Sequence, residues 1–341
     1  MMRHNPFTSI KDSIKNGFYI TLDVLKYIRA NPKILVPIIG IKLLYVSIPV
    51  VLLVYTTLLD SVVVNFLEME YSTGITVLML YLIVVYFRFF ETLGASYSLE
   101  LVRQNDADGS MSLLKGLGHL ITRSLLRILP IILIWSALEM ILKFIIAVIK
   151  GILRSLTGER GSLAERGTDF TGRIFNKALR LAMLMALPMV VWEKRGPIES
   201  VTDGFDAFET KAGDVFSGMG VRMFFYTIML IPAVALLSLA YRFGFLDTPF
   251  TFVVIAYVLI LWSLDFLVEI LFSTKIYLWY SAWQTKRREA FKNHETLPLI
   301  DDIEQPSFLS GYADSYMKER VKASKKDGSH GTHRHQPINF N

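Results

Sequence analysis

The chain of 341 residues contains no cysteine. This absence excludes disulfides, thiolate metal sites, iron–sulfur ligation and cysteine nucleophiles. Charged residues are also scarce, at 19% of the chain, against about 25% in soluble globular domains. Hydrophobic residues reach 52% and the mean hydropathy is +0.43. Because the apolar residues also come in long blocks, composition alone predicts an integral membrane protein.

Motifs of common enzymes and cofactor sites are missing as well. The sequence has no P-loop, HExxH, GxSxG, CxxC or Rossmann fingerprint. We therefore expect no enzymatic activity, no metal site and no cofactor. The net charge of +6 is spread over connections and a tail without interleaved aromatic residues. That distribution favours cytoplasmic loops of a membrane protein over nucleic-acid binding.

Six stretches are long and apolar enough to cross the ~30 Å hydrocarbon core of a bilayer. The predicted fold is all-α, a polytopic transmembrane helix bundle within residues 1–292. Residues 293–341 are predicted to form a polar cytoplasmic tail that is partly disordered. The predicted spans are residues 34–59, 75–99, 128–149, 174–192, 221–241 and 249–283.

The basic residues of the connections predict the orientation. Residues 3–33 contain six Lys or Arg residues, whereas the connection after the first span contains none. The positive-inside rule then predicts a protein of the cell membrane with both termini on the cytoplasmic side. The connection between spans three and four disagrees, because five basic residues lie on its predicted outer side. Either this connection is an exception or span three re-enters without crossing. The five residues are Lys150, Arg154, Arg160, Arg166 and Arg173.

A short pattern recurs three times: Ser, an aliphatic residue, any two residues, Gly, then Phe or Leu. It occupies residues 13–18, 200–205 and, more loosely, 112–117. Each copy lies in an amphipathic stretch, the first over residues 6–29, and two predicted spans follow each. The sequence thus predicts a unit of an interfacial amphipathic helix and a transmembrane hairpin, used three times. The alternative is that any basic amphipathic helix at a membrane surface gives such a match.

These amphipathic stretches also predict contacts. The glycine of each copy would let another backbone approach closely. In the third copy, Gly196-Pro197 suits a helix start. Apolar residues then recur at steps of three and four through Met219, which predicts one continuous apolar helix face. Basic residues on these helices make the lipid bilayer and anionic lipid headgroups the expected partners. The apolar positions are Ile198, Val201, Phe205, Phe208, Ala212, Val215 and Met219.

Seven ionisable residues inside the predicted spans form a candidate intramembrane polar network. Charges at membrane depth are costly unless paired, so each is a functional candidate. Arg88 with Glu91, and Glu139 with Lys143, are spaced so that each pair can form within one helix. Asp265 and Glu269 carry the same sign, so they need cations from other helices, or a proton. Three cations face four acids, which leaves one acid that could be protonated. The seven are Lys42, Arg88, Glu91, Glu139, Lys143, Asp265 and Glu269.

The chain resembles an uncharacterised family of prokaryotic six-helix membrane proteins, a domain of unknown function. The resemblance lies in Arg29-Ala30-Asn31-Pro32-Lys33, which enters span one, and in residues 186–200. In the second stretch a span ends in proline and an acid, and a basic residue and glycine then open an amphipathic helix. The resemblance covers most of residues 5–290 and implies architecture alone.

Two functions follow from these patterns. The first is a transporter or permease-like component with a polar path at the centre. The alternative is a non-transporting scaffold, or an assembly or regulatory protein, in which an ion network fixes helix packing. A water-accessible cavity at Asp265 or Glu139 would favour the first, and a dry, fully paired core would favour the second. A membrane enzyme is the least favoured reading.

Overall fold

The computed structural model describes residues 6–58, 73–157, 163–244 and 249–305, and the regular elements in these ranges are all helical. Six long helices each contain a stretch that is long and apolar enough to cross a membrane, as predicted. They are α2 (Leu35–Leu58), α4 (Thr73–Asp108), α6 (Leu125–Thr157), α7 (Leu163–Val191), α9 (Ala212–Phe243) and α10 (Pro249–Lys292). The shorter elements are α1 (Pro6–Ala30), η1 (Pro32–Ile34), α5 (Leu113–His119), the π-helical turn η2 (Leu120–Ser124), α8 (Pro197–Thr210) and η3 (Ile300–Asp302).

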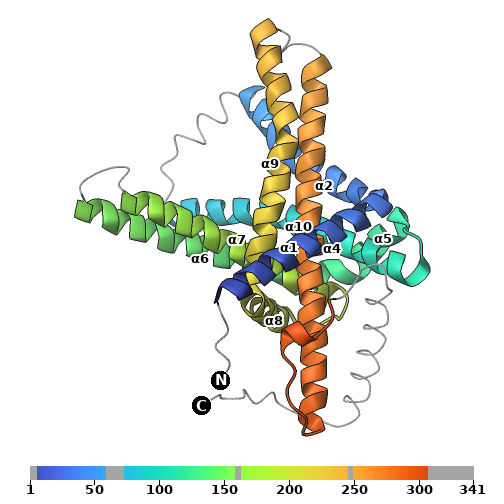
Figure 1. Cartoon of the computed structure of the whole chain (residues 1–341). Coiled ribbons are helices and arrows are strands. Elements are labelled where there is room, and N and C mark those ends of the chain that lie inside the picture. Colours follow the sequence, from blue (N-terminus) through green and yellow to red (C-terminus); the bar gives the residue numbers. More distant parts are fainter. Residues whose placement is uncertain (1–5, 59–72, 158–162, 245–248, 306–341) are drawn as a thin grey trace.

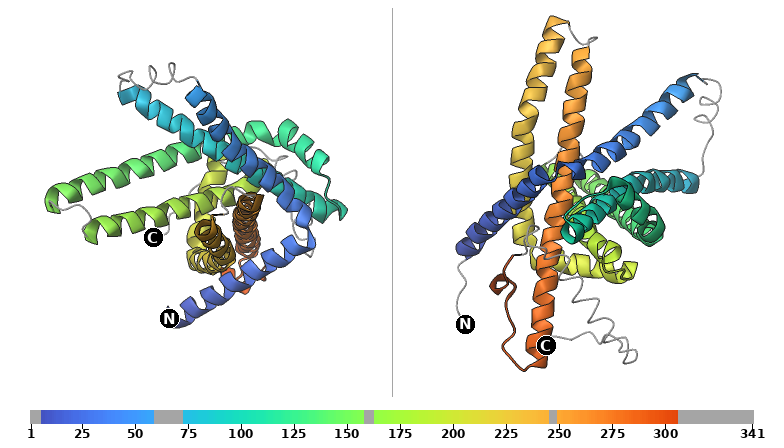
Figure 2. Two further views of the ribbon diagram at one scale, coloured as in Figure 1. Left: turned by 90° about the horizontal axis from the view of Figure 1, so that it is seen from above. Right: turned by 90° about the vertical axis from the view of Figure 1, so that its right-hand side faces the viewer.

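The long helices pack as three hairpins, α2/α4, α6/α7 and α9/α10. The hairpins diverge from a common centre instead of forming one parallel bundle (Figures 1 and 2). Their outer parts, here called the arms, expose large apolar side chains such as Leu44, Leu78, Phe144, Phe224 and Phe252. A helix that is apolar on its exposed faces is stable only in an apolar surrounding, so the arms suit a lipid bilayer.

The inner parts of the hairpins form a packed core at the centre. Residues 181–192 of α7 and its end, and residues 266–282 of α10, are buried throughout. The core also contains polar side chains, including Thr92, Ser96 and Ser98 on α4. The Ser98 hydroxyl donates a hydrogen bond of 3.0 Å to the Gly94 carbonyl one turn back. Such a bond satisfies a hydroxyl without a partner from another helix.

The three short helices interlock the hairpins. Helix α5 packs on α4, α8 packs mainly on α7, and α1 packs on α9 and α10. Each short helix therefore holds the hairpin of the preceding unit, and the first closes the ring by reaching the last. Each short helix precedes a hairpin in the sequence, as predicted, but in space it packs on a hairpin of another unit.

The motif glycines sit at these contacts, as predicted. A Cβ atom at Gly17 would lie 2.5 Å from the backbone nitrogen of Gly218. One at Gly204 would lie 2.6 Å from the Ala182 carbonyl oxygen. One at Gly116 would lie 2.9 Å from the Leu101 side chain. Real Cβ contacts are longer, and the neighbours of Gly17 and Gly204 are backbone atoms, so these two positions require glycine for the helices to approach. At Gly116 the neighbour is the end of a flexible side chain, which can shift.

The prediction of one continuous amphipathic helix in the third unit is wrong. Helix α8 ends at Thr210, and Lys211 leaves the helical conformation with φ −121° and ψ 26°. The remaining apolar positions, from Ala212 onward, belong to α9. The Lys211 ammonium is buried between Asp214, at 3.2 Å, and Asp301. Two carboxylates therefore compensate the charge of this buried cation where the helix breaks.

The buried face of α8 also differs from the expected apolar one. Ser200, Gly204 and Ala207 are buried, whereas Ile198 and Phe205 are exposed. Small residues therefore face the neighbouring helix because only they permit this close approach. In the second unit, α5 continues through η2 into α6, so the amphipathic stretch and the span form one helical run.

The connection that violates the positive-inside rule is mostly helical. Helix α6 is continuous for 33 residues, and α7 packs beside it. The structure therefore provides no turn within span three for a re-entrant path. Lys150 on α6 pairs with Asp169 on α7. Arg160 and the side chains of Arg154 and Arg166 lie outside the described part of the chain.

The first part of the predicted tail folds back on the end of α10. The indole N–H of Trp279 donates to the Ile303 carbonyl at 2.9 Å, and that of Trp283 donates to the Pro298 carbonyl at 2.9 Å. Residues 298–303, here called the strap, thus cover two aromatic side chains. Residues 306–341 lie outside the described ranges.

Candidate functional site

The predicted charges of the first two hairpins meet at the centre. Arg88 on α4 pairs with Glu91 of its own helix and with Glu139 on α6, the latter at 2.5 Å. Lys143 also reaches Glu139, at 2.8 Å. Both pairs predicted from spacing are present, and Arg88 joins them across the two hairpins. The guanidinium of Arg88 also stacks on Trp135, at 4.6 Å from the ring centroid.

Two arginines connect this group to the third hairpin. Arg180 on α7 lies 3.0 Å from Glu269 on α10 and 3.7 Å from Glu91. Arg222 on α9 lies 3.1 Å from Asp265 and 3.2 Å from Glu269. We call the connected set the central network; it consists of Arg88, Glu91, Glu139, Lys143, Arg180, Arg222, Asp265 and Glu269.

Arg180 and Arg222 were absent from the sequence-derived set. Both lie inside stretches predicted as spans, but near the ends of those spans. At such positions a basic residue is usually assigned to the membrane interface or to a loop. An ionised side chain is costly at any position of a span. A candidate set that contained every ionisable residue of the predicted spans would have included both arginines. Asp265 and Glu269 on α10 carry the same sign, which had already indicated that they need cations from other helices or a proton.

The charge balance differs from the expected one. Adding Arg180 and Arg222 to the predicted set gives five cations against four acids. Glu91, Glu139 and Glu269 are each held by two cations. No acid is left over, and the expectation of a spare carboxyl group is therefore wrong.

Of the three cations in the predicted set, Lys42 on α2 is the one that stays outside the ion pairs of the described residues. Its ammonium has no hydrogen-bond partner among the described residues and is 2% exposed. It lies 4.0 Å from the ring centroid of Trp262, 4.5 Å from that of Phe266 and 5.0 Å from that of Tyr45. Three aromatic faces attract a cation electrostatically. They replace the carboxylate that Lys42 lacks.

The surroundings of Glu91 are dry. The pocket beside Lys42 and Glu91 has no space for a water molecule. The side chains of Glu139 and Glu269 are 4% exposed. In such a low dielectric, loss of one partner leaves an uncompensated charge and is costly. The buried carboxylates of the central network and their cations therefore depend on one another for charge compensation.

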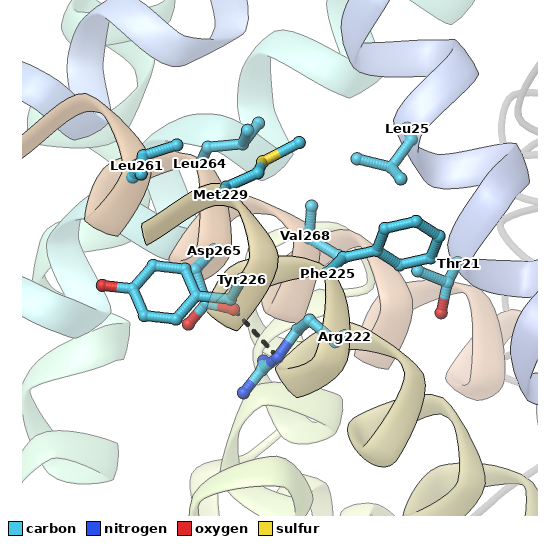
Figure 3. Close-up of a pocket in the computed structure, with 10 residues that line it drawn as sticks. All are labelled: Thr21, Leu25, Arg222, Phe225, Tyr226, Met229, Leu261, Leu264, Asp265 and Val268. Atoms are coloured by element: carbon cyan, nitrogen blue, oxygen red, sulfur yellow. Dashed lines mark ion pairs between the residues drawn. The ribbon is translucent and has the colours of Figure 1, made fainter. Parts of the chain in front are cut away.

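Asp265 is the exception, because it borders a second pocket (Figure 3). This pocket lies where α1 crosses α9 and α10, and its lining is otherwise mostly apolar, including Leu25, Phe225 and Leu264. Its volume of about 30 Å³ holds one or two waters. The Asp265 side chain is 22% exposed and has Arg222 as its ion-pair partner. Asp265 is therefore the most exposed acid of the central network.

A separate polar cluster lies outside the spans, where α7 ends and α8 begins. Arg195 lies 2.7 Å from Glu193 and 2.5 Å from Asp203, and Tyr277 donates a hydrogen bond to Glu193. Burial raises the pKa of the Glu193 and Asp203 carboxyl groups, and the positive charge of Arg195 opposes that rise. This cluster anchors the break between the second and third units.

A polar cleft of about 600 Å³ opens near the strap. Asp12 and Lys15 of α1, Lys211 and Asp301 line it, and Lys211 lies 3.7 Å from the ring centroid of Trp279. Within the described ranges, no group of three or more His, Cys, Asp or Glu side chains could hold a metal ion.

The chain matches no family model, and neither the curated proteins nor the solved structures contain a match to it. The fold and the central network fit a multi-pass α-helical membrane protein, since six helices are apolar and long enough to span a bilayer. The resemblance to the six-helix family stays a prediction from the sequence.

Proposed function

We propose that the protein is a transporter or permease-like component of a cell membrane, with both termini in the cytoplasm. The observation that carries this proposal is a charged network that joins all three hairpins and reaches a pocket at Asp265. Ionisable residues at membrane depth are expensive and usually mark a pathway for ions, protons or substrates.

The shared partners suit a moving assembly. Arg180 lies between Glu91 of the first hairpin and Glu269 of the third. A shift of one hairpin would lengthen one of these contacts and shorten the other, so the charge would stay compensated. Such exchange of ion pairs is a common basis for two alternative arrangements of packed helices. Asp265 would admit water or a proton from the pocket.

The alternative is a non-transporting scaffold or regulatory protein. It is favoured by the pairing of Glu91, Glu139 and Glu269 with two cations each, and by the dry pocket at Glu91. In this role α1 and α5 would bind anionic lipid headgroups, whereas α8 contains four acidic residues and no Lys or Arg. The exposed apolar side chains of α1 and α5, such as Phe18 and Leu114, lie beside exposed Lys15 and Lys115.

Cysteine accessibility separates the two functions, since the chain has no native cysteine. We would label Leu264→Cys, which lines the pocket, with a membrane-impermeant thiol reagent in cells and in inverted vesicles. Ile228→Cys, on the exposed apolar face of α9, is the matched control. Labelling at residue 264 alone supports a water-filled path. If residue 264 is labelled from neither side, the proposal of a transporter is contradicted and the scaffold or regulatory role is favoured.

The topology has its own test. Ser155→Cys and Tyr241→Cys lie near the tips of two arms, and Lys292→Cys lies at the end of α10. We expect the first two to react from outside intact cells and the third to react only in inverted vesicles. Reaction of Ser155→Cys only from the inside would contradict the proposed orientation of the second hairpin.

A further inference from the structure

Just outside the buried part of α7, Lys177 presents to α9 an ammonium that lacks a carboxylate partner among the described residues. The Lys177 Nζ atom lies 3.1 Å from the sulfur of Met223. Among the described residues it has no carboxylate within ion-pair distance. A thioether is a weak acceptor, so it does not replace a counter-ion.

Two arginines lie beside Lys177, and one of them has a spare donor. The Nε atom of Arg180 is buried and has no hydrogen-bond partner among the described residues. The Nε atom of Arg222 lies 3.1 Å from an Asp265 oxygen and is paired with that carboxylate. Unused donors on a planar guanidinium suit an oxyanion with several acceptor atoms.

The acids that face this group do not balance it. Asp265 and Glu269 are the carboxylates near all three cations, and the more distant Glu91 is already held by Arg88. When Lys177 is added to the central network, five cations face its four acids, Glu91, Glu139, Asp265 and Glu269. A surplus positive charge in a low dielectric is costly unless an anion compensates it.

Apolar surface continues directly from these cations. Phe175 on α7 and Phe224 on α9 are exposed, and Ile228 and Ile231 follow along the α9 arm. A free anion would satisfy the cations alone, whereas a lipid would also cover this surface with its acyl chains. The combination of a cationic base and apolar arms selects the amphiphile.

We propose that the phosphate of an anionic phospholipid binds between the α6/α7 and α9/α10 hairpins, at Lys177, Arg180 and Arg222. Its acyl chains lie along the α7 and α9 arms. This site is separate from the amphipathic helices and holds whether or not the protein transports a solute. The lipid supplies the missing negative charge and holds two diverging hairpins at a fixed separation.

The test uses the purified full chain in a zwitterionic detergent, titrated with phosphatidylglycerol or phosphatidylcholine. Lipid retained by the protein is counted by native mass spectrometry, and the unfolding temperature is recorded. We expect retention of phosphatidylglycerol over phosphatidylcholine and a higher unfolding temperature with the former. Lys177→Gln should weaken phosphatidylglycerol binding about tenfold, the effect of one charge-assisted hydrogen bond. Lys177→Arg should preserve it.

Lys143→Gln is the matched control, because this lysine occupies the α6 arm but already pairs with Glu139. Equal losses in Lys143→Gln and Lys177→Gln would overturn the site, as would equal retention of both lipids. A third titration uses inorganic phosphate without lipid. If phosphate alone raises the unfolding temperature as much as phosphatidylglycerol does, the site binds a free anion and the lipid proposal fails. If Lys177→Gln does not fold, the arginine variant and the lipid comparison still decide.

Discussion

At the scale of single residues, Glu269 carries the largest share of the ion pairing between the second and third hairpins. Its side chain is 4% exposed and contacts Arg180 and Arg222. Both arginines would lose a counter-charge if this carboxylate were neutralised, while their own charges would stay buried. Removing one partner from a buried ionic group costs more than the pairing itself contributed.

We therefore expect Glu269→Gln to lower the free energy of unfolding by about 3 kcal/mol. Lys143→Gln removes a charge from the same network, but its side chain is 52% exposed, so its loss should be below about 1 kcal/mol. Denaturant titration in detergent measures both. A loss in Glu269→Gln as small as that in Lys143→Gln would show that the network contributes little to stability.

A second residue-scale prediction concerns the motif glycine of α8. A methyl group at Gly204 would lie 2.6 Å from the Ala182 carbonyl oxygen, which cannot move without shifting α7. Gly204→Ala should therefore destabilise the protein by about 2 kcal/mol through overpacking. Gly220→Ala on α9 meets nothing within 4 Å and should raise stability slightly, since alanine favours a helix. An unchanged unfolding temperature in Gly204→Ala would argue against the close α7–α8 contact.

At the scale of elements, the strap is held by a few polar contacts and by the packing of Ile300 and Ile303 on the core. Two indole N–H groups donate to its backbone, and Asp301 pairs with the buried Lys211. Short segments with so few bonds open locally at low free-energy cost. The strap therefore depends on individual side chains, unlike the long helices.

We expect Trp283→Phe, which removes the bond to Pro298, to speed proteolysis within residues 293–305 several-fold. The loss of about 1 kcal/mol from a single hydrogen bond produces a change of this size in local opening. Phe291→Leu is the control, because that side chain is 70% exposed at the end of the same helix. Limited proteolysis with mass mapping gives the rates, and similar cleavage in both variants would contradict the docked strap.

At the scale of the whole molecule, the ring is closed by α1 of the first unit, which packs on α9 of the third. Ser217 donates a hydrogen bond of 2.6 Å to the Ser13 carbonyl at this contact. A Cβ atom at Gly213 would lie 3.5 Å from that of Ser13, which is within the range for a disulfide.

The double variant Ser13→Cys/Gly213→Cys should therefore form an intramolecular disulfide on mild oxidation. The bond closes a loop of about 200 residues and should stabilise the fold by roughly 2–4 kcal/mol. Loss of maleimide labelling and a reductant-sensitive rise in unfolding temperature provide the readout. Ser13→Cys/Gly220→Cys is the control, because Gly220 has no neighbour within 4 Å. Efficient cross-linking in the control would mean that α1 is not fixed on α9.

The sequence by itself determined the helical membrane class, the six apolar helices, the in-helix pairs of Arg88 with Glu91 and Glu139 with Lys143, and the close approach at the motif glycines. These features depend on composition, on helical spacing and on the absence of a Cβ atom, all of which are local properties of the chain.

Only the tertiary structure decided on which hairpin each short helix packs and which cations reach the acids of α10. Arg180 and Arg222 are distant from Glu269 along the chain, and nothing in their local pattern selects that partner. The environment of Lys42 likewise depends on tertiary packing, because two of the rings around its ammonium, Trp262 and Phe266, come from α10. The third ring, Tyr45, comes from α2 itself. Charges interact through space at a few ångströms, so their balance is fixed only when the helices are packed.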